Sequence, residues 1–264
     1  MSSFVKIVIF SILLFPNLAF GNESDFRKSR CEHFIIQYHK DVDASYVRKV
    51  RDKSERLYRN ITQEFNLIRD KLWTWDNRAK IFVAKDKDDY ISDYSCPAWS
   101  GACVDYVNKI IYTYPDQKRF DSILAHELTH IIFREYVGNA QLELWLDEAI
   151  AVYVENKYGQ DVNSYLLSHV KKALIRDQHI KFNDLRKITA LTLDTSSQDR
   201  VSLFYAQSFS VVHFLIKRYG RDRFAYFLFF LKNGKNFESA LSRGFASLSS
   251  ADDLEKKWKK FYLE

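Results

Sequence analysis

The chain has 264 residues, of which 47% are hydrophobic and 16% aromatic, and its formal net charge is +6. This composition supplies a core large enough for one globular domain and excludes an intrinsically disordered protein. Glycine (7) and proline (3) are scarce, which excludes long flexible linkers and a glycine-rich phosphate-binding loop. The basic run at Lys256–Lys260 follows acidic residues and is typical of a solvated helix face, so we expect no nucleic-acid partner.

The N-terminus has the layout of an export signal. Lys6 precedes an apolar stretch from Ile7 to Phe20, and Ala19 and Gly21 occupy the small-residue positions of a cleavage site. We therefore expect residues 1–21 to be a signal peptide and residues 22–264 to form one exported domain, either periplasmic or secreted. The stretch is too short to span a bilayer comfortably, so no stable membrane insertion is expected after cleavage. An uncleaved membrane anchor is the alternative.

The first part of the mature chain predicts a small mixed sheet and one long helix. Val47, Val50, Leu57, Ile61 and Phe65 recur at helical spacing. Short apolar runs on either side of this helix predict strands, the last two joined as a hairpin through Asn108. These runs cover residues 33–39, 80–84, 102–107 and 109–114.

The rest of the chain predicts helices. Asp121 is suited to cap a helix that ends at Gly138, and the next helix runs from about Leu142 to Tyr158 with Gly159 as its stop. Later helices are expected over residues 161–173, the first capped by Asp161, and over residues 201–219, 222–231, 237–242 and 251–261. The expected fold class is therefore α+β, with a small N-terminal mixed sheet and a C-terminal helical bundle.

A metal-binding pattern lies inside the first of these helices. The segment reads His126-Glu127-Leu128-Thr129-His130, and the spacing of four residues places both imidazoles on one helix face. Zinc suits such a site, because it accepts imidazole and carboxylate ligands and lowers the pKa of a bound water towards about 7. Glu127 lies beside that water and can take its proton.

The following helix supplies a carboxylate. Seventeen residues separate His130 from Glu148, which lies in the segment Trp145-Leu146-Asp147-Glu148-Ala149-Ile150-Ala151. The two motifs together resemble the gluzincins, the peptidase MA-like proteins related to thermolysin and the zinc aminopeptidases. The resemblance runs in order along roughly the whole mature chain and implies a zincin-like catalytic domain.

The resemblance also implies the roles of individual residues. One Zn²⁺ ion is expected on His126, His130 and Glu148, with Glu127 as the general base of peptide hydrolysis. A later element, Phe204-Tyr205-Ala206-Gln207-Ser208, is similar to a helix of the family, and it implies that Tyr205 donates a hydrogen bond to the oxyanion. A second interpretation is that Tyr205 is one of sixteen tyrosines and packs in the core.

Two departures from the family pattern bear on specificity. Ala149 replaces the usual glycine after the third ligand, which leaves the ligand set intact. The zinc aminopeptidases carry a Gly-x-Met-Glu-Asn element whose glutamate holds the substrate amine, whereas this chain reads Gly101-Ala102-Cys103-Val104-Asp105. We therefore expect an endopeptidase or a narrow-specificity peptidase that binds an extended peptide on an edge strand. Asp105 as a substitute amine anchor stays open.

Other residues have supporting roles. Glu155 lies seven residues after Glu148 and is suited either to orient His126 or His130 or to face solvent. Cys96 and Cys103 flank a turn-forming segment and are the likelier disulfide pair, with buried free thiols as the alternative. Cys31 is then left over.

Two other functions fit the same sequence. The first is a secreted binding module that keeps the fold without turnover, against which the intact Glu127 argues. The second is hydrolysis of a non-protein amide or ester by the same chemistry. The sequence leaves the substrate and the oligomeric state open.

Overall fold

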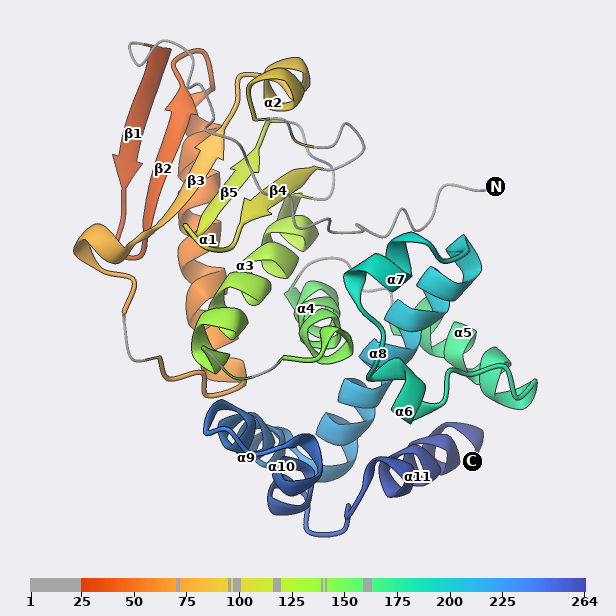
Figure 1. The fold of residues 1–264 in the computed structure, drawn as a ribbon. Coiled ribbons are helices and arrows are strands. Elements are labelled where there is room, and N and C mark those ends of the chain that lie inside the picture. Colours follow the sequence, from red (N-terminus) through yellow and green to blue (C-terminus); the bar gives the residue numbers. More distant parts are fainter. Residues whose placement is uncertain are drawn as a thin grey trace.

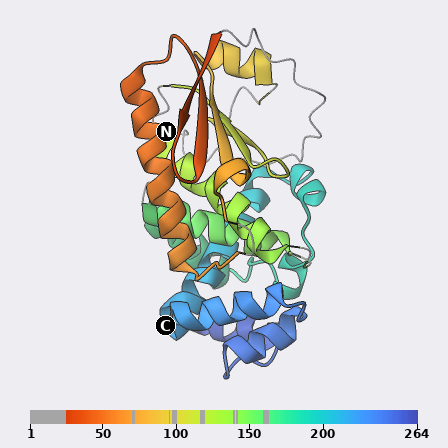
Figure 2. The ribbon, with the colours of Figure 1, turned by 90° about the vertical axis from the view of Figure 1, so that its left-hand side faces the viewer.

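The protein is described here from a computed structural model, which describes residues 25–69, 72–94, 96, 101–115, 120–138, 140, 142–158 and 163–264. The expected signal peptide lies outside these residues, as do the expected helix stop Gly159 and cap Asp161. A sheet with its flanking helices forms one end of the molecule, and helices alone form the other, as seen in two perpendicular views (Figures 1 and 2). The α+β prediction is confirmed.

The sheet has five strands in the order β1-β2-β3-β5-β4. The inner pairs β2–β3 and β3–β5 are parallel, whereas the outer pairs β1–β2 and β4–β5 are antiparallel, so the sheet is mixed as predicted. The strands are β1 Phe26–Arg30, β2 Phe34–His39, β3 Ala79–Val83, β4 Ala102–Asp105 and β5 Ile110–Thr113. β1 was not predicted, and β4 is the terminal strand beside the helical part of the chain.

The two faces of the sheet bury different clusters, because successive strand residues point to opposite sides. Ile81 and Ile111 face the main core, together with α1 (Ala44–Glu64) and α3 (Phe120–Val137). Asp43 begins α1 by accepting hydrogen bonds from the backbone N–H groups of Ser45 and Tyr46.

On the other face of the sheet, Phe82 and Tyr112 pack in a small second cluster with Tyr90 and Tyr94 of α2 (Lys87–Tyr94). The cluster also contains Cys96 and Cys103, whose predicted disulfide is confirmed. The bridge therefore joins the segment after α2 to β4.

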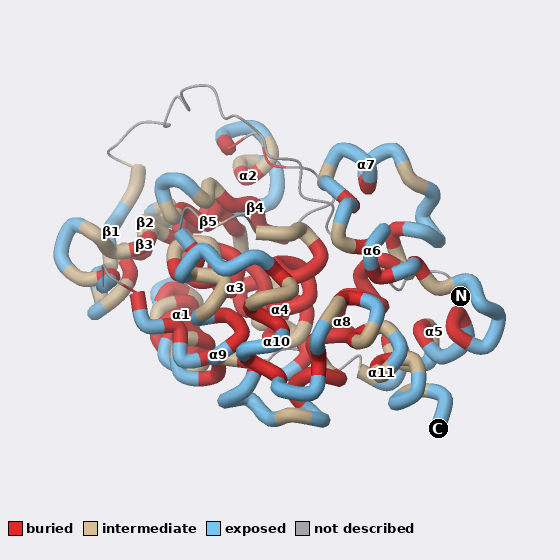
Figure 3. The backbone as a smooth tube through the Cα atoms, turned by 60° about the horizontal axis from the view of Figure 1, so that its bottom comes forward, coloured by how far each residue is buried: buried red, intermediate tan, exposed pale blue. Residues whose placement is uncertain are grey.

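The helices α3 and α4 (Leu144–Tyr158) form the centre of the molecule, and both are buried on nearly all sides (Figure 3). Such helices are apolar around most of their circumference, so each charged side chain on them needs a local partner. Gly138 ends α3 with a left-handed φ of 63°. Asp121 is not the N-cap as expected: it lies within the first turn of α3 and pairs with Lys53.

The remaining helices are α5 Asn163–Ile175, α6 Phe182–Leu185, α7 Ala190–Asp194, α8 Gln198–Tyr219, α9 Arg221–Lys232, α10 Phe237–Gly244 and α11 Ala251–Leu263, with a short 3₁₀ turn at Trp75–Asn77. The helices α5 and α8 to α11 were predicted, whereas α2, α6 and α7 were not. Across the described ranges, no helix combines the length and apolar character needed to cross a bilayer.

Candidate metal centre

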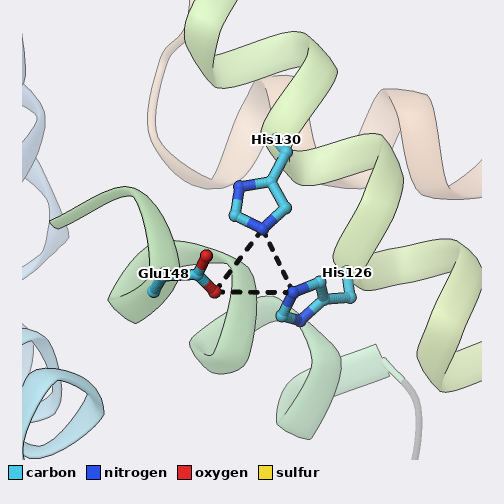
Figure 4. Close-up of side chains that lie close together, drawn as sticks. All are labelled: His126, His130 and Glu148. Atoms are coloured by element: carbon cyan, nitrogen blue, oxygen red, sulfur yellow. Dashed lines mark hydrogen bonds and ion pairs between the residues drawn. The ribbon is translucent and has the colours of Figure 1, made fainter. Parts of the chain in front are cut away.

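Three predicted metal ligands converge between α3 and α4 (Figure 4). The Nε2 atoms of His126 and His130 lie 3.1 Å apart, one helical turn from each other on α3. Oε2 of Glu148, on α4, lies 3.8 Å from Nε2 of His126 and 3.7 Å from Nε2 of His130. All three residues are buried, so these atoms form a compact triangle shielded from bulk water.

The triangle has the size and chemistry of a metal site. Bonds of about 2.0–2.2 Å at tetrahedral angles place neighbouring ligand atoms about 3.4 Å apart, close to the separations found here. Oε2 of Glu148 is buried without a hydrogen-bond partner among the described side chains. An unpartnered buried carboxylate oxygen is costly in a protein, and a cation at the centre of the triangle would satisfy it.

The outer nitrogen of each imidazole faces a carboxylate on α4. Nδ1 of His126 donates a hydrogen bond to Oε2 of Glu155 at 3.1 Å, in accordance with the predicted orienting role of Glu155. Nδ1 of His130 lies 3.0 Å from Oδ1 of Asp147, a charge contact in which the N–H is not aligned for a hydrogen bond. These contacts favour a proton on Nδ1 and leave Nε2 of both rings directed at the triangle.

Asp147 was missed by the sequence analysis, although it precedes Glu148 directly. Its second carboxylate oxygen accepts a hydrogen bond from Nε of Arg134 at 2.8 Å and forms an ion pair with Nη2 of Arg134 at 2.7 Å. Burial alone raises the pKa of Asp147, but the charge of His130, with the charge and hydrogen bond of Arg134, outweighs burial and lowers it to about 2. Asp147 is therefore a buried, ionised carboxylate.

Tyr106, in the turn between β4 and β5, was also missed. Its ring stacks on the guanidinium of Arg134, with Cζ 4.0 Å from the ring centroid, and meets the His130 ring edge-on at 5.9 Å. Burial raises the pKa of Tyr106 well above its ordinary value, and the negative charge of Glu127 acts in the same direction. The hairpin at the end of the sheet thus reaches the candidate site.

Glu127 lies beside the triangle on α3 and is 1% exposed. Burial raises its pKa to about 7, against the opposing influence of His126 and His130. Its Oε2 has no hydrogen-bond partner among the described side chains. A buried carboxylate with a free oxygen and a pKa near neutrality has the properties of a proton acceptor in catalysis.

Tyr205 and Asp105 are two further candidate residues of the sequence. Tyr205 lies on α8, is 3% exposed, and has its pKa raised by burial and by the charges of Glu148 and Glu127, which places it within electrostatic reach of the site. Asp105 instead accepts hydrogen bonds from the backbone and side-chain nitrogens of Asn108, at 3.0 and 2.7 Å. Its carboxylate is therefore engaged within the hairpin turn.

A second His and Glu cluster lies elsewhere in the described chain. It consists of Glu32, His33 and Glu55, and Glu32 is exposed. Both oxygens of Glu55 are already bonded to His33, one to the backbone N–H at 2.8 Å and one to Nδ1 at 2.7 Å. His33 and Glu55 are better explained as an ion pair that links the residue before β2 to α1.

The mixed sheet is followed by a buried helix pair that carries two histidines on its first helix and a glutamate on its second. The family model described as Peptidase MA superfamily matches residues 94–264. The chain belongs to this superfamily, and its class is that of the metallopeptidases.

The fold is also similar to a solved structure of yeast LTA4 hydrolase in complex with bestatin, with a TM-score of 0.54 and 15% sequence identity. The match covers 91% of this chain and 39% of the LTA4 hydrolase chain. At this identity the likeness establishes the fold alone. Comparison with curated protein sequences gave no match.

Proposed function

We propose that this protein is an exported zinc-dependent peptidase in which His126, His130 and Glu148 hold one Zn²⁺ ion and Glu127 is the general base. The observation that carries the proposal is the buried triangle of two Nε2 atoms and one carboxylate oxygen, with Glu127 beside it. Membership of the Peptidase MA superfamily supports hydrolysis of peptide bonds. The signal-peptide pattern in residues 1–21 supports export.

Zinc bound at this site supplies a Lewis acid for the scissile carbonyl and lowers the pKa of water. Proton transfer, orientation of the ligands and binding of the oxyanion are the roles of the protein side chains. Glu127 accepts the proton of the attacking water on its free Oε2 and passes that proton to the departing amine nitrogen. Glu155 and Asp147 hold the proton on Nδ1 of each histidine, which keeps both Nε2 lone pairs available. Tyr205 donates a hydrogen bond from its hydroxyl group to the developing oxyanion.

The substrate we propose is an internal segment of a peptide or protein chain. An aminopeptidase needs a carboxylate that holds the substrate amine, and Asp105, the one acidic residue at the comparable place, is bonded to Asn108 in the hairpin turn. β4 is the terminal strand of the sheet and contacts α3, so an extended peptide added to β4 passes the histidines. This arrangement favours an endopeptidase over an aminopeptidase.

The proposal is tested by incubating the purified mature chain, as wild type and as Glu127→Gln, with a mixed peptide pool with free or acetylated N-termini. The wild type is expected to cleave both kinds of peptide. Its cleavage activity is expected to be lost when a chelator is added and to return when zinc is supplied. Glu127→Gln is expected to lose about 10²- to 10⁴-fold in rate. Equal rates for the two proteins would contradict the role of Glu127, and cleavage of free N-termini alone would contradict the endopeptidase assignment.

A further inference from the structure

The contacts around His130 form a closed ring of four side chains from three separate elements. Asp147 of α4 lies against Nδ1 of His130 and is held by Arg134 of α3. The Arg134 guanidinium also lies over the ring of Tyr106, and the Tyr106 ring in turn meets the His130 imidazole edge-on. These four side chains together join a proposed metal ligand, His130, to the β4–β5 hairpin, which lies beside α3 in Figure 1.

We propose that Arg134 is a positioning residue that fixes His130 through Asp147 and couples the metal site to the hairpin through Tyr106. This proposal rests on the proposed zinc site. The contacts of Arg134 reach the proposed ligand His130 through Asp147 and Tyr106. Its positive charge also acts on Glu148 directly.

The energetic reason lies in the burial of Asp147, which is 2% exposed. One of its oxygens lies against His130, and the other is held by Nε and Nη2 of Arg134. A buried carboxylate that loses its cation is left uncompensated and moves towards water. That movement releases Nδ1 of His130 and leaves its ring orientation undetermined.

The guanidinium is suited to this position because it is planar. It contacts Asp147 through both Nε and Nη2, and its Cζ lies 4.0 Å from the centroid of the Tyr106 ring. A lysine ammonium keeps the charge but cannot do both. Loss of the stack removes this contact between the hairpin and α3. Tyr106 directly follows β4, the strand on which we propose that the substrate peptide binds.

Arg186 offers a control whose contacts include neither His130 nor Asp147. Its guanidinium bonds Glu143 through Nε and Nη2, at 3.0 and 2.7 Å, and stacks on Phe237 at 4.0 Å. It also pairs with Glu238 through Nη1 at 3.1 Å. Arg186→Met therefore removes at least as many ion pairs as Arg134→Met, together with a stack on an aromatic ring. Only Arg134→Met removes contacts that lead to His130.

The test measures the zinc dissociation constant by chelator competition, and amide hydrogen exchange of the β4–β5 hairpin, in the full mature chain. Arg134→Met is expected to weaken zinc binding about 10- to 100-fold and to speed hairpin exchange, with Arg134→Lys intermediate in both. Arg186→Met is expected to match the wild type in both. If Arg134→Met does not fold, Tyr106→Leu is expected to shift both readouts in the same direction.

Zinc affinity of the Arg134 variants within threefold of wild type would overturn the positioning role and leave the proposed zinc site standing. An equal loss of zinc affinity in Arg186→Met would show that Arg134 supports the fold in general and does not position His130, which would overturn the proposal. A wild-type chain that binds no zinc would overturn the zinc site and the positioning role together. Hairpin exchange that is unchanged in Arg134→Met would overturn the coupling to the hairpin.

Discussion

Glu155 accepts a hydrogen bond from Nδ1 of His126 at 3.1 Å, seven residues beyond Glu148 on the same helix. Burial lowers the pKa of His126, but Glu155, with the further charges of Glu127 and Glu148, outweighs burial and raises it to about 9. Two turns of α4 thus supply both a proposed ligand and the residue that orients another ligand.

Replacing Glu155 by alanine is therefore expected to weaken zinc binding by about tenfold or more, because the His126 ring loses its orienting partner. The measurement is chelator competition at constant pH. Glu255→Ala is the control, since Glu255 makes a similar contact with Nε2 of His179 at 3.1 Å in another part of the molecule. Zinc affinity that is equal in Glu155→Ala and Glu255→Ala would contradict the orienting role.

Tyr205→Phe tests the oxyanion role directly. Loss of one donor to a developing oxyanion costs about 10²- to 10³-fold in kcat, and zinc content is expected to stay unchanged. Tyr94→Phe is the control, because Tyr94 is equally buried in the cluster on the far face of the sheet. A Tyr205→Phe rate within a few-fold of wild type would leave Tyr205 as a core residue, the second interpretation of the sequence.

The disulfide between Cys96 and Cys103 closes a short loop, with a sequence separation of 7. Replacing both cysteines by serine is expected to lower the free energy of unfolding by about 2–3 kcal/mol, from the chain entropy of a loop of this length. Urea denaturation measures the change, with Cys31→Ser as the single-site control. An unchanged midpoint for the double variant would show that packing around α2 is sufficient without the bridge.

Cys31 is free and half-buried. Burial raises the pKa of its thiol to about 12, and the neighbouring Glu55 carboxylate adds to the effect. Because the thiolate is the reactive form, the native protein at pH 8 is expected to take up iodoacetamide far more slowly than the protein in denaturant. Mass spectrometry follows the uptake, and equal rates in the two conditions would contradict this placement of Cys31.

Glu55 is expected to contribute to the loss of folding stability at low pH. Burial alone raises the pKa of Glu55, but hydrogen bonds from His33 and Cys31 outweigh it and leave the pKa below its ordinary value. Stability gained from a lowered carboxyl pKa is complete above the unfolded pKa and is lost as the pH falls through the folded pKa. Glu55→Gln is therefore expected to lose less stability than wild type on acidification below about pH 5. Parallel pH profiles from urea denaturation would contradict this.

The sequence predicts most of the fold because its apolar periodicities are strong. The helices α1, α3, α4 and α8 and the hairpin β4–β5 follow from buried positions at regular spacing. β1 gives no such signal: its residues Phe-Arg-Lys-Ser-Arg are mostly exposed, and it is held by antiparallel pairing with β2. The short helices α6 and α7 escape prediction because helical periodicity needs more than one turn to be seen.

In the candidate site, too, some residues could be predicted from local sequence spacing and others could not. Glu155 was accessible to sequence analysis because it shares a helix face with Glu148. Arg134 lies four residues after His130, so their shared face was a signal that could have been used. Asp147 and Tyr106 depend on the packing of α4 and of the hairpin against α3, which the sequence does not specify locally.

The proposed zinc site consists of His126, His130 and Glu148 beside Glu127. Elemental analysis of the metal-replete mature protein tests this site, with the wild type beside His130→Ala and Glu127→Gln. We expect about one zinc per chain in the wild type and in Glu127→Gln, and none in His130→Ala, because only the last removes a ligand. A wild type that holds no zinc, or a His130→Ala protein that keeps it, would contradict the account.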